Sequence, residues 1–361
     1  MNIRKVLVFP AATEIGLEIN EALRQCKEIS LVGAGFGGST HAPFAFEAFF
    51  ELPSIHQSDW LDRLIELCHS LSLDYIFPAY DDAIVALAES ADRLPAHVLA
   101  PPLDICKLTR SKRNTYRALA DIVRVPELYE AEPAADSFPV FVKPDRGQGS
   151  QGARLVHDAQ QLRQALAAEP DLIACEYLPG QEYTVDCFSD REHGLLFAKA
   201  RIRTRTRNGI AVNTVSINLP EARAIGERIH ARLGMRGAWF FQLKRASNGM
   251  LALLEVAPRI AGSMSTHRVA GVNFPLLTIF EHERLPISIL LNDGPIELDR
   301  SLRNRFRHSV SFGTLYIDLD DTLVLRNKVN LDAIRLVFLA RNQQARVVLI
   351  TRHSEIGRAH V

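Results

Sequence analysis

The segment that ends in Glu255 carries the clearest pair of residues able to bind a metal ion, Gln242 and Glu255. Between them stands Asn248-Gly249, the dipeptide preferred in two-residue type I′ hairpins. A turn at that dipeptide pairs Ser247 with Met250 and, further along both strands, Gln242 with Glu255. Directly opposed side chains share one face of a ribbon, with Cβ atoms about 4.5–5.5 Å apart. An amide oxygen and a carboxylate so placed are predicted to hold one hard cation such as Mg²⁺.

Glu255 itself stands in an otherwise apolar strand. A buried carboxylate without a partner there would cost several kcal/mol. Magnesium bound by Glu255, Gln242 and nucleotide phosphates would remove that cost. The alternative is an ion pair between Glu255 and a nearby arginine such as Arg259. We favour the metal over the ion pair.

A glycine-rich loop follows the short apolar strand Val140-Phe-Val-Lys-Pro144. Glycines at 147, 149 and 152 allow backbone amides to approach a phosphate, and Lys143 supplies a fixed positive charge. No Gly-Lys-Ser or Gly-Lys-Thr follows, so the loop is neither a P-loop nor a dinucleotide fingerprint. By itself the loop indicates a phosphate cradle no more strongly than a glycine-rich hairpin without a ligand.

A second basic feature is a run of alternating cations, Lys199, Arg201, Arg203, Arg205 and Arg207. Side chains alternate faces along a strand, so a regular strand would place all five cations on one face. Such a row repels itself unless an anion lies opposite, and a triphosphate fits that requirement. The alternative is an edge strand or surface hairpin that uses charge to avoid aggregation.

The elements that must position these residues follow from the hydrophobic pattern. Apolar runs alternate with helical segments up to about residue 100, which predicts a parallel sheet with crossover helices. From about 139 to 258 the pattern becomes β-rich, with helices near 158–168 and 221–233. The basic stretch 301–308 is interpreted as a linker, and a new segment begins beyond it.

Composition limits the classes of function. The 42 basic and 42 acidic residues cancel, which argues against binding to nucleic acid or to a membrane by bulk electrostatics. The five cysteines are scattered without a CxxC spacing and are interpreted as reduced thiols. No signal peptide and no apolar run of the roughly 20 residues that a membrane span needs is found. We therefore expect a cytoplasmic protein.

Four motifs, in their order and spacing, resemble the ATP-grasp superfamily, and most closely its carbamoyl-phosphate-synthase-like carboxylate–amine ligases. The resemblance spans about residues 1–295 and implies an α/β and α+β fold. A parallel-sheet domain at 1–108 would precede a two-subdomain ATP-grasp domain at 109–300. The motifs are Lys112 at a helix start, Lys143 with its glycine loop, the segment Glu176 to Asp186, and the segment Glu255 to Ser263.

The resemblance also implies a role for each matching position. Phosphate and adenine contacts fall to Lys112, Lys143, Gly149 and Ser150; the adenine hinge to Glu176, Tyr177 and Leu178; the ribose to Glu182; magnesium to Gln242 and Glu255; and catalysis to Arg259, Arg203 and Lys143, with Arg259 facing an acyl phosphate. The family usually has a further metal ligand, asparagine, two residues after the glutamate. Here that residue is Ala257, on the same face as Glu255 by the hairpin register.

The expected reaction uses ATP and Mg²⁺ to activate a small-molecule carboxylate as an acyl phosphate, which an amine then attacks. A homodimer is an open alternative for the assembly. The missing asparagine favours a second function, a nucleotide-binding regulatory module without ligase turnover. A third function, phosphatase chemistry, would require a complete C-terminal domain.

That domain is suggested by residues 311–361, which resemble the beginning of a haloacid-dehalogenase-like phosphatase with a partial Rossmannoid fold. An apolar strand leads to Asp318, the nucleophile in the resemblance, and to Asp320, the acid/base; a second strand ends at Thr351, a phosphate ligand. The later lysine and acidic pair of that family do not follow, so we expect an inactive segment. Residues 356–361 can be back-translated into a common sequencing-adapter sequence, which predicts that the natural reading frame continues into a full phosphatase domain.

Overall fold

The structure is a computed structural model of the 361-residue chain. It describes residues 3–38, 40–147, 151–207, 209–292, 294–302, 304–305 and 311–352. The chain divides into two compact units, residues 1–305 and residues 306–361. In the described part of the chain, no helix is long and apolar enough to cross a membrane.

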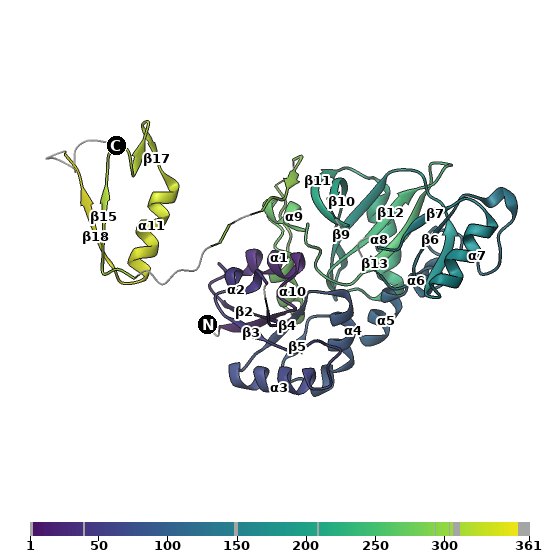
Figure 1. Ribbon diagram of the computed structural model, residues 1–361, viewed down its shortest axis with the longest axis horizontal. Helices are drawn as coiled ribbons and strands as arrows, with labels where there is room; N and C mark the ends of the chain where they lie inside the picture. The colour runs from purple at the N-terminus through teal and green to yellow at the C-terminus, as the bar shows by residue number, and fades with distance from the viewer. Residues whose placement is uncertain are drawn as a thin grey trace. The chain divides into compact units, whose positions relative to one another are not determined.

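The first unit begins with a parallel five-stranded sheet of order β3-β2-β1-β4-β5 (Figure 1). Its strands are β1 (Arg4–Phe9), β2 (Ile29–Gly35), β3 (Phe49–Glu51), β4 (Tyr75–Pro78) and β5 (His97–Val98). The accompanying helices are α1 (Glu14–Leu23), α2 (Ala42–Ala45), α3 (Trp60–Leu71), α4 (Asp81–Glu89) and α5 (Leu103–Arg110). Parallel pairing of all these strands confirms the expectation from the sequence.

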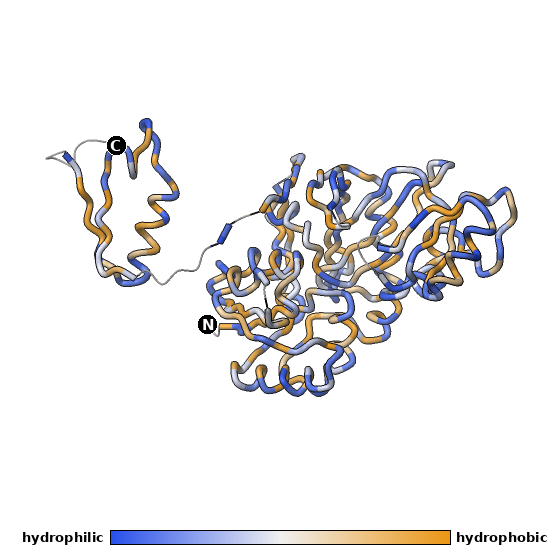
Figure 2. The backbone as a smooth tube through the Cα atoms, in the orientation of Figure 1, coloured by the Kyte–Doolittle hydropathy of each residue, from blue (hydrophilic) through white to orange (hydrophobic). Residues whose placement is uncertain are grey.

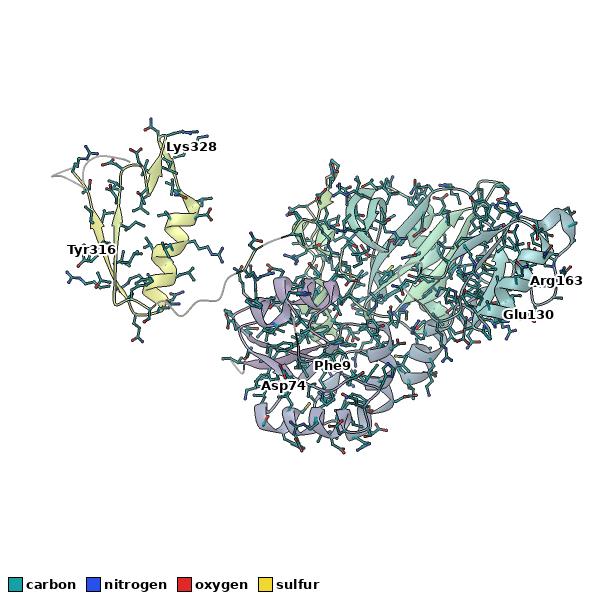
Figure 3. All side chains as sticks on the ribbon, viewed as in Figure 1. Phe9, Asp74, Glu130, Arg163, Tyr316 and Lys328 are labelled. Carbon is teal, nitrogen blue, oxygen red and sulfur yellow. The ribbon has the colours of Figure 1, made fainter. Side chains whose placement is uncertain are left out.

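The sheet is buried on both faces, as a parallel sheet between helices must be. The side chains of Val6, Leu7 and Val8 in β1 are fully buried. On the side of α3, the ring of Phe9 (labelled in Figure 3) stacks on Trp60 with centroids 6.5 Å apart. Continuous apolar strands with helices on both faces explain why the local pattern alone predicted this layer.

Helices α5 and α6 (Lys112–Leu119) lead from this sheet to a small antiparallel sheet of order β7-β6-β8. Its strands are β6 (Val140–Pro144), β7 (Arg154–Val156) and β8 (Leu172–Glu176), with α7 (Ala159–Ala168) beside them. The apolar side chains of β6 and β8 pack on α7 around Leu162. Glu130 and Arg163, labelled in Figure 3, lie in this part of the unit.

The largest sheet is antiparallel, with the order β13-β12-β9-β10-β11-β14. Its strands are β9 (Glu182–Asp190), β10 (Gly194–Arg207), β11 (Ile210–Ile217), β12 (Gly237–Arg245), β13 (Leu251–Ala257) and β14 (Glu297–Asp299). The associated helices are α8 (Glu221–Leu233), α9 (Ser265–Val269) and α10 (Phe274–His282).

Alternation along β12 assigns each face of this sheet to a different neighbour. Trp239 and Phe241 pack in one buried cluster with Ile229 of α8. Phe240 points to the other face and packs in a second cluster together with Val8 of β1 and Ile19 of α1. The second cluster joins the N-terminal sheet to the large sheet. At this junction Asp81 at the start of α4 contacts Arg259, which follows β13.

The second unit contains two parallel strands, β15 (Thr314–Asp318) and β18 (Arg346–Ile350), linked by α11 (Leu331–Asn342). A short hairpin of β16 (Val324–Leu325) and β17 (Lys328–Val329) precedes the helix. Apolar residues run without a break from Leu336 to Ala340 in α11 (Figure 2), and Phe338 within this run is 65% exposed. This βαβ arrangement agrees with the partial Rossmannoid fold expected for the segment.

Candidate active site

A pocket lies between the small sheet and the large sheet. Most of the site residues expected from the sequence line it: Lys112, Lys143, Glu176, Tyr177, Leu178, Glu182, Arg203, Gln242 and Glu255. They come from α6, β6, β8, β9, β10, β12 and β13 and from the segment just after β8. Gly149 and Ser150, also expected to bind phosphate, lie outside the described residues. The structure therefore brings together residues that are more than 140 positions apart in the chain.

Gln242 and Glu255 are direct partners across β12 and β13, as the sequence predicted. The turn that the prediction assumed is wrong. Gly249 has a φ of +79°, but Asn248 does not have the positive φ that a type I′ turn requires. The amide of Gly249 donates to the Ala246 carbonyl over 2.9 Å, and the Ala246 amide donates to Met250 over 2.8 Å. These bonds define a three-residue loop, a type I turn followed by a glycine bulge.

A second irregularity restores the expected pair. The three-residue loop shifts the register by one, so Leu243 faces Leu253. A bulge at Leu254 then inserts one residue into β13, and beyond it Gln242 faces Glu255. Ala257 pairs with Phe240 and lies on the face of Glu255, as expected.

The surroundings of Glu255 are consistent with a cation site. Among the residues that the structure describes, no basic side chain lies within ion-pair distance of the Glu255 carboxylate. The predicted alternative partner, Arg259, instead binds Asp81: its Nε lies 2.5 Å from Oδ1 and its Nη2 3.1 Å from Oδ2. The ion-pair explanation for Glu255 is therefore wrong. Gln242 and Glu255 offer only oxygen ligands on one sheet face, the donor type that Mg²⁺ prefers.

Lys143 lies at the end of β6 with its side chain only 8% exposed. Its Nζ donates a hydrogen bond to the Tyr116 hydroxyl over 2.7 Å and lies 5.2 Å from the centre of that ring. Burial lowers the pKa of Lys143, and the nearby Cys175 and Glu255 oppose the shift. A buried ammonium directed into a pocket favours an anionic ligand.

Lys112 begins α6 and fixes the glycine-rich loop. Its Nζ donates to the backbone carbonyls of Pro144, Asp145 and Gly147 at 3.2–3.3 Å. The Asp145 carboxylate in turn accepts from the Arg113 amide over 2.7 Å at the start of the helix. Burial lowers the pKa of Lys112, and Glu255 acts in the opposite direction. One lysine thus ties the helix start to the loop that follows β6.

The two glutamates of the hinge segment have different surroundings. The Glu176 carboxylate accepts a hydrogen bond from Arg124 over 2.6 Å, and Glu176, Tyr177 and Leu178 all line the pocket. Glu182 forms an ion pair with Arg203 inside the pocket. The sequence assigned Glu182 and Arg203 separately to ribose and to catalysis, and the structure shows that they contact each other.

The cationic strand is less regular than predicted. Two register shifts flank Arg205 in the pairing of β10 with β11. Arg201 is buried and binds Asp186 at 2.7 and 3.1 Å, and Arg205 binds Asp299 on the surface. Of the arginines in this strand, Arg203 alone lines the pocket described above. The prediction of one continuous cationic face opposite a triphosphate is therefore wrong.

A second pocket adjoins the first and shares Lys112, Gly147, Gln151, Arg203, Gln242 and Glu255 with it. Its other wall contains Glu14 at the start of α1, Asp81 at the start of α4, and Arg259. All the donor-bearing nitrogens of Arg259 face Asp81 or the Ile260 carbonyl, and Phe240 lies against the guanidinium at 5.1 Å. Burial alone would raise the pKa of Asp81, but Arg259 holds it below its usual value.

Sequence reasoning missed Tyr116 and Asp81. Tyr116 follows Lys112 by four residues on the same helix, so the two side chains share a face, which was a usable signal. Asp81 comes shortly after β4, at the carboxyl edge of a parallel sheet, where ligands of open α/β sheets bind. Its pairing with Arg259 spans 178 positions and has no local signal.

In the second unit, Asp318 ends β15 and pairs with Ile350, the residue before Thr351. Asp318 and Thr351 therefore lie at the same edge of the two-stranded sheet. Asp320 forms an isolated backbone β-bridge with Val324. No cluster of three histidine, cysteine or acidic residues that could hold a metal is found among the described residues of either unit. The phosphatase assignment stays a prediction.

Comparison with known proteins supports the ATP-grasp resemblance. A family model described as "ATP-grasp in the biosynthetic pathway with Ter operon" matches residues 168–286, about a third of the chain. No curated protein matches the chain. Many solved structures match it, and they show that the first unit has the ATP-grasp fold.

Three of these structures illustrate the likeness. The biotin carboxylase domain of Hydrogenobacter thermophilus 2-oxoglutarate carboxylase, solved with MgADP, ADP and bicarbonate, has a TM-score of 0.67 at 14% identity, with 82% of this chain and 74% of that chain covered. The L-amino acid ligase of Bacillus licheniformis has a TM-score of 0.61 at 18% identity, with 77% and 73% covered. Rhizobium etli pyruvate carboxylase has a TM-score of 0.63 at 18% identity; 80% of this chain is covered, but only 29% of that chain.

Proposed function

We propose that the chain is an ATP-dependent carboxylate–amine ligase that uses Mg²⁺. The observation that carries the proposal is the meeting of two pockets at Gln242 and Glu255. Phosphoryl transfer needs the donor phosphate and the acceptor carboxylate on either side of one charged centre. The pocket between the two antiparallel sheets would take ATP, and the pocket facing the N-terminal sheet would take the substrates.

Each side chain then has a separate task. Lys143 places positive charge beside the phosphates, where negative charge moves during transfer, and Arg203 lies in the same pocket paired with Glu182. Lys112 holds the loop after β6 in place. Gln242 and Glu255 would bind Mg²⁺, which when present neutralises phosphate charge. Ala257 offers no oxygen, so the chain supplies fewer metal ligands than the family usually does.

The ion pair between Arg259 and Asp81 affects the role proposed for Arg259. In this structure the guanidinium is held by Asp81, so its positive charge in the pocket is partly compensated. A carboxylate substrate entering beside Arg259 would compete with Asp81 for the same donors. We propose that Arg259 faces the acyl phosphate from this position, with Asp81 fixing its orientation.

The test is a screen of organic acids and amines for stimulated release of ADP and phosphate from ATP. The active combination is then repeated with Glu255→Gln, which keeps the size of the side chain, and with Asp62→Asn on the exposed surface of α3 as a matched control. We expect Glu255→Gln to lose turnover and the control to keep it. Unchanged turnover in Glu255→Gln would overturn the proposal.

A regulatory module is the second candidate, because Ala257 removes a metal ligand from the site. It predicts binding of ATP with no combination of acid and amine that stimulates hydrolysis. The edge shared by Asp318 and Thr351 supports a third proposal, phosphatase chemistry at the second unit. Loss of phosphomonoester hydrolysis in Asp318→Asn would support it.

A further inference from the structure

The ammonium of Lys143 is held by a neutral partner. Its Nζ donates to the Tyr116 hydroxyl over 2.7 Å, and the tyrosine side chain is only 1% exposed. An ion pair with Glu255 would instead cancel the charge of both groups. Because the Tyr116 hydroxyl is uncharged, it fixes the position of Lys143 and leaves the full positive charge available to a phosphate.

The direction of this hydrogen bond is set from the other side. A tyrosine hydroxyl has one proton to donate. Tyr116 donates it to the Leu254 carbonyl over 2.7 Å. The lone pairs of the hydroxyl therefore remain to accept from Lys143, and the polarity of the chain from Lys143 through Tyr116 to Leu254 is fixed.

The acceptor of this chain is the bulged residue of β13. Leu254 is the inserted residue between Leu253 and Glu255, and in a bulge the extra residue is left outside the regular pairing. Its carbonyl is therefore available to Tyr116. One hydroxyl group thus links Lys143 of the small sheet to the residue next to Glu255 in the large sheet.

We propose that Tyr116 is a positioning residue for nucleotide binding, which holds Lys143 against the phosphates and in register with Glu255. This inference rests on the proposed function, since it assumes that the pocket binds ATP. In this role Tyr116 acts through Lys143 and does not itself contact the reacting atoms. Its effect on nucleotide affinity should therefore depend on the presence of the lysine.

The charged and titratable groups around Lys143 set the expected pH dependence. Tyr116 and Lys112 face it from α6, Cys175 from β8, Glu255 from β13 and Lys244 from β12. Burial already lowers the pKa of Lys143. Removal of a hydrogen-bond acceptor from the ammonium disfavours the charged form, so Tyr116→Phe should lower that pKa further. The phosphate contact is then lost at a lower pH than in the wild-type protein.

The experiment measures MgATP affinity by calorimetry for the whole chain and for Tyr116→Phe, Lys143→Met and the double variant, from about pH 6 to about pH 10. Tyr75→Phe is the matched control, because it removes a hydroxyl bonded to Glu283 at 3.1 Å, which does not line the ATP pocket. Thermal melting establishes that each variant is folded.

We expect Tyr116→Phe to bind MgATP about tenfold more weakly than wild type, with a loss that grows as the pH rises. In the Lys143→Met background the same substitution should change affinity by less than about twofold. An unchanged affinity for Tyr116→Phe, or an equal loss with and without Lys143, would overturn the positioning role. A wild-type chain that binds no MgATP would overturn the proposed function, and this inference with it.

Discussion

The pair formed by Asp81 and Arg259 allows a quantitative test of how the N-terminal sheet is joined to the ATP-grasp part. Asp81→Ala removes a carboxylate that meets Arg259 through two contacts, of 2.5 and 3.1 Å. The two side chains are only 16% and 12% exposed. The substitution therefore leaves a guanidinium largely buried without its counter-ion.

Removal of one partner from a buried pair typically destabilises a protein by 3–5 kcal/mol, and the slight exposure of this pair places it at about 3 kcal/mol. For a unit of this size that loss corresponds to a fall of roughly 5–10 °C in melting temperature. The matched control is Asp62→Ala, whose partner Arg93 lies 3.3 Å away on the surface, with the Asp62 side chain 72% exposed. Exposed pairs of this kind contribute about 0–1 kcal/mol, so the control should melt close to wild type.

The pH dependence of the melting temperature tests the same ion pair independently. Arg259 holds the pKa of Asp81 below its usual value despite burial. The stabilisation is therefore present above the unfolded carboxyl pKa of about 3.9 and is lost as pH falls through the lower, folded value. Melting curves of Asp81→Ala and wild type should converge in acid. Equal melting temperatures at neutral pH for Asp81→Ala and the Asp62→Ala control would refute this reasoning.

Two further predictions concern other parts of the large sheet. Gly249→Ala should lower the free energy of unfolding by about 1 kcal/mol, because Gly249 has a positive φ. Asn248→Ala should cost less than Gly249→Ala. The reverse order in urea titrations would favour the type I′ turn. Asp186→Ala should lower the free energy of unfolding by about 3 kcal/mol. Asp186 is fully buried against Arg201, and its Oδ2 lies 3.1 Å from Nε2 of His267. A loss below about 1 kcal/mol in chemical denaturation would show that the protein does not depend on this buried cluster.

Local patterns were sufficient to predict the N-terminal layer and several helices. The helix expected at 221–233 is α8, and the helix expected near 158–168 is α7. Apolar strands and amphipathic helices leave a signal in neighbouring residues, and no distant contact is needed to interpret it. The pocket residues also followed, because the ATP-grasp resemblance rests on motifs whose order in the chain is fixed.

The hairpin shows where sequence reasoning reaches its limit. The pairing of Gln242 with Glu255 was predicted from a two-residue turn and a regular ribbon, and neither is present. The longer turn and the bulge at Leu254 shift the register in opposite directions and cancel. The bulge is stabilised by residues distant in the chain, since the Leu253 amide donates to the Arg124 carbonyl and the Tyr116 hydroxyl donates to the Leu254 carbonyl. No residue near the turn indicates those contacts.

The prediction of one cationic face along residues 199–207 fails for a similar reason. Strict alternation predicts one charged face for residues 199–207, but the partners of those cations lie far away in the chain. Arg205 binds Asp299, 94 positions later, and Arg201 binds Asp186 on the neighbouring strand β9. Strand irregularities and carboxylates from other segments decide which cations reach the pocket, and a single sequence does not display either.

The central claim is that Gln242 and Glu255 bind one divalent ion that also contacts the nucleotide phosphates. The most direct measurement is a crystal structure with Mn²⁺ and a non-hydrolysable ATP analogue, with the ion located by anomalous scattering. We expect a peak roughly 2.0–2.2 Å from a Glu255 carboxylate oxygen and from the Gln242 amide oxygen, in contact with the phosphates near Lys143. A nucleotide bound with its metal away from both side chains would contradict it.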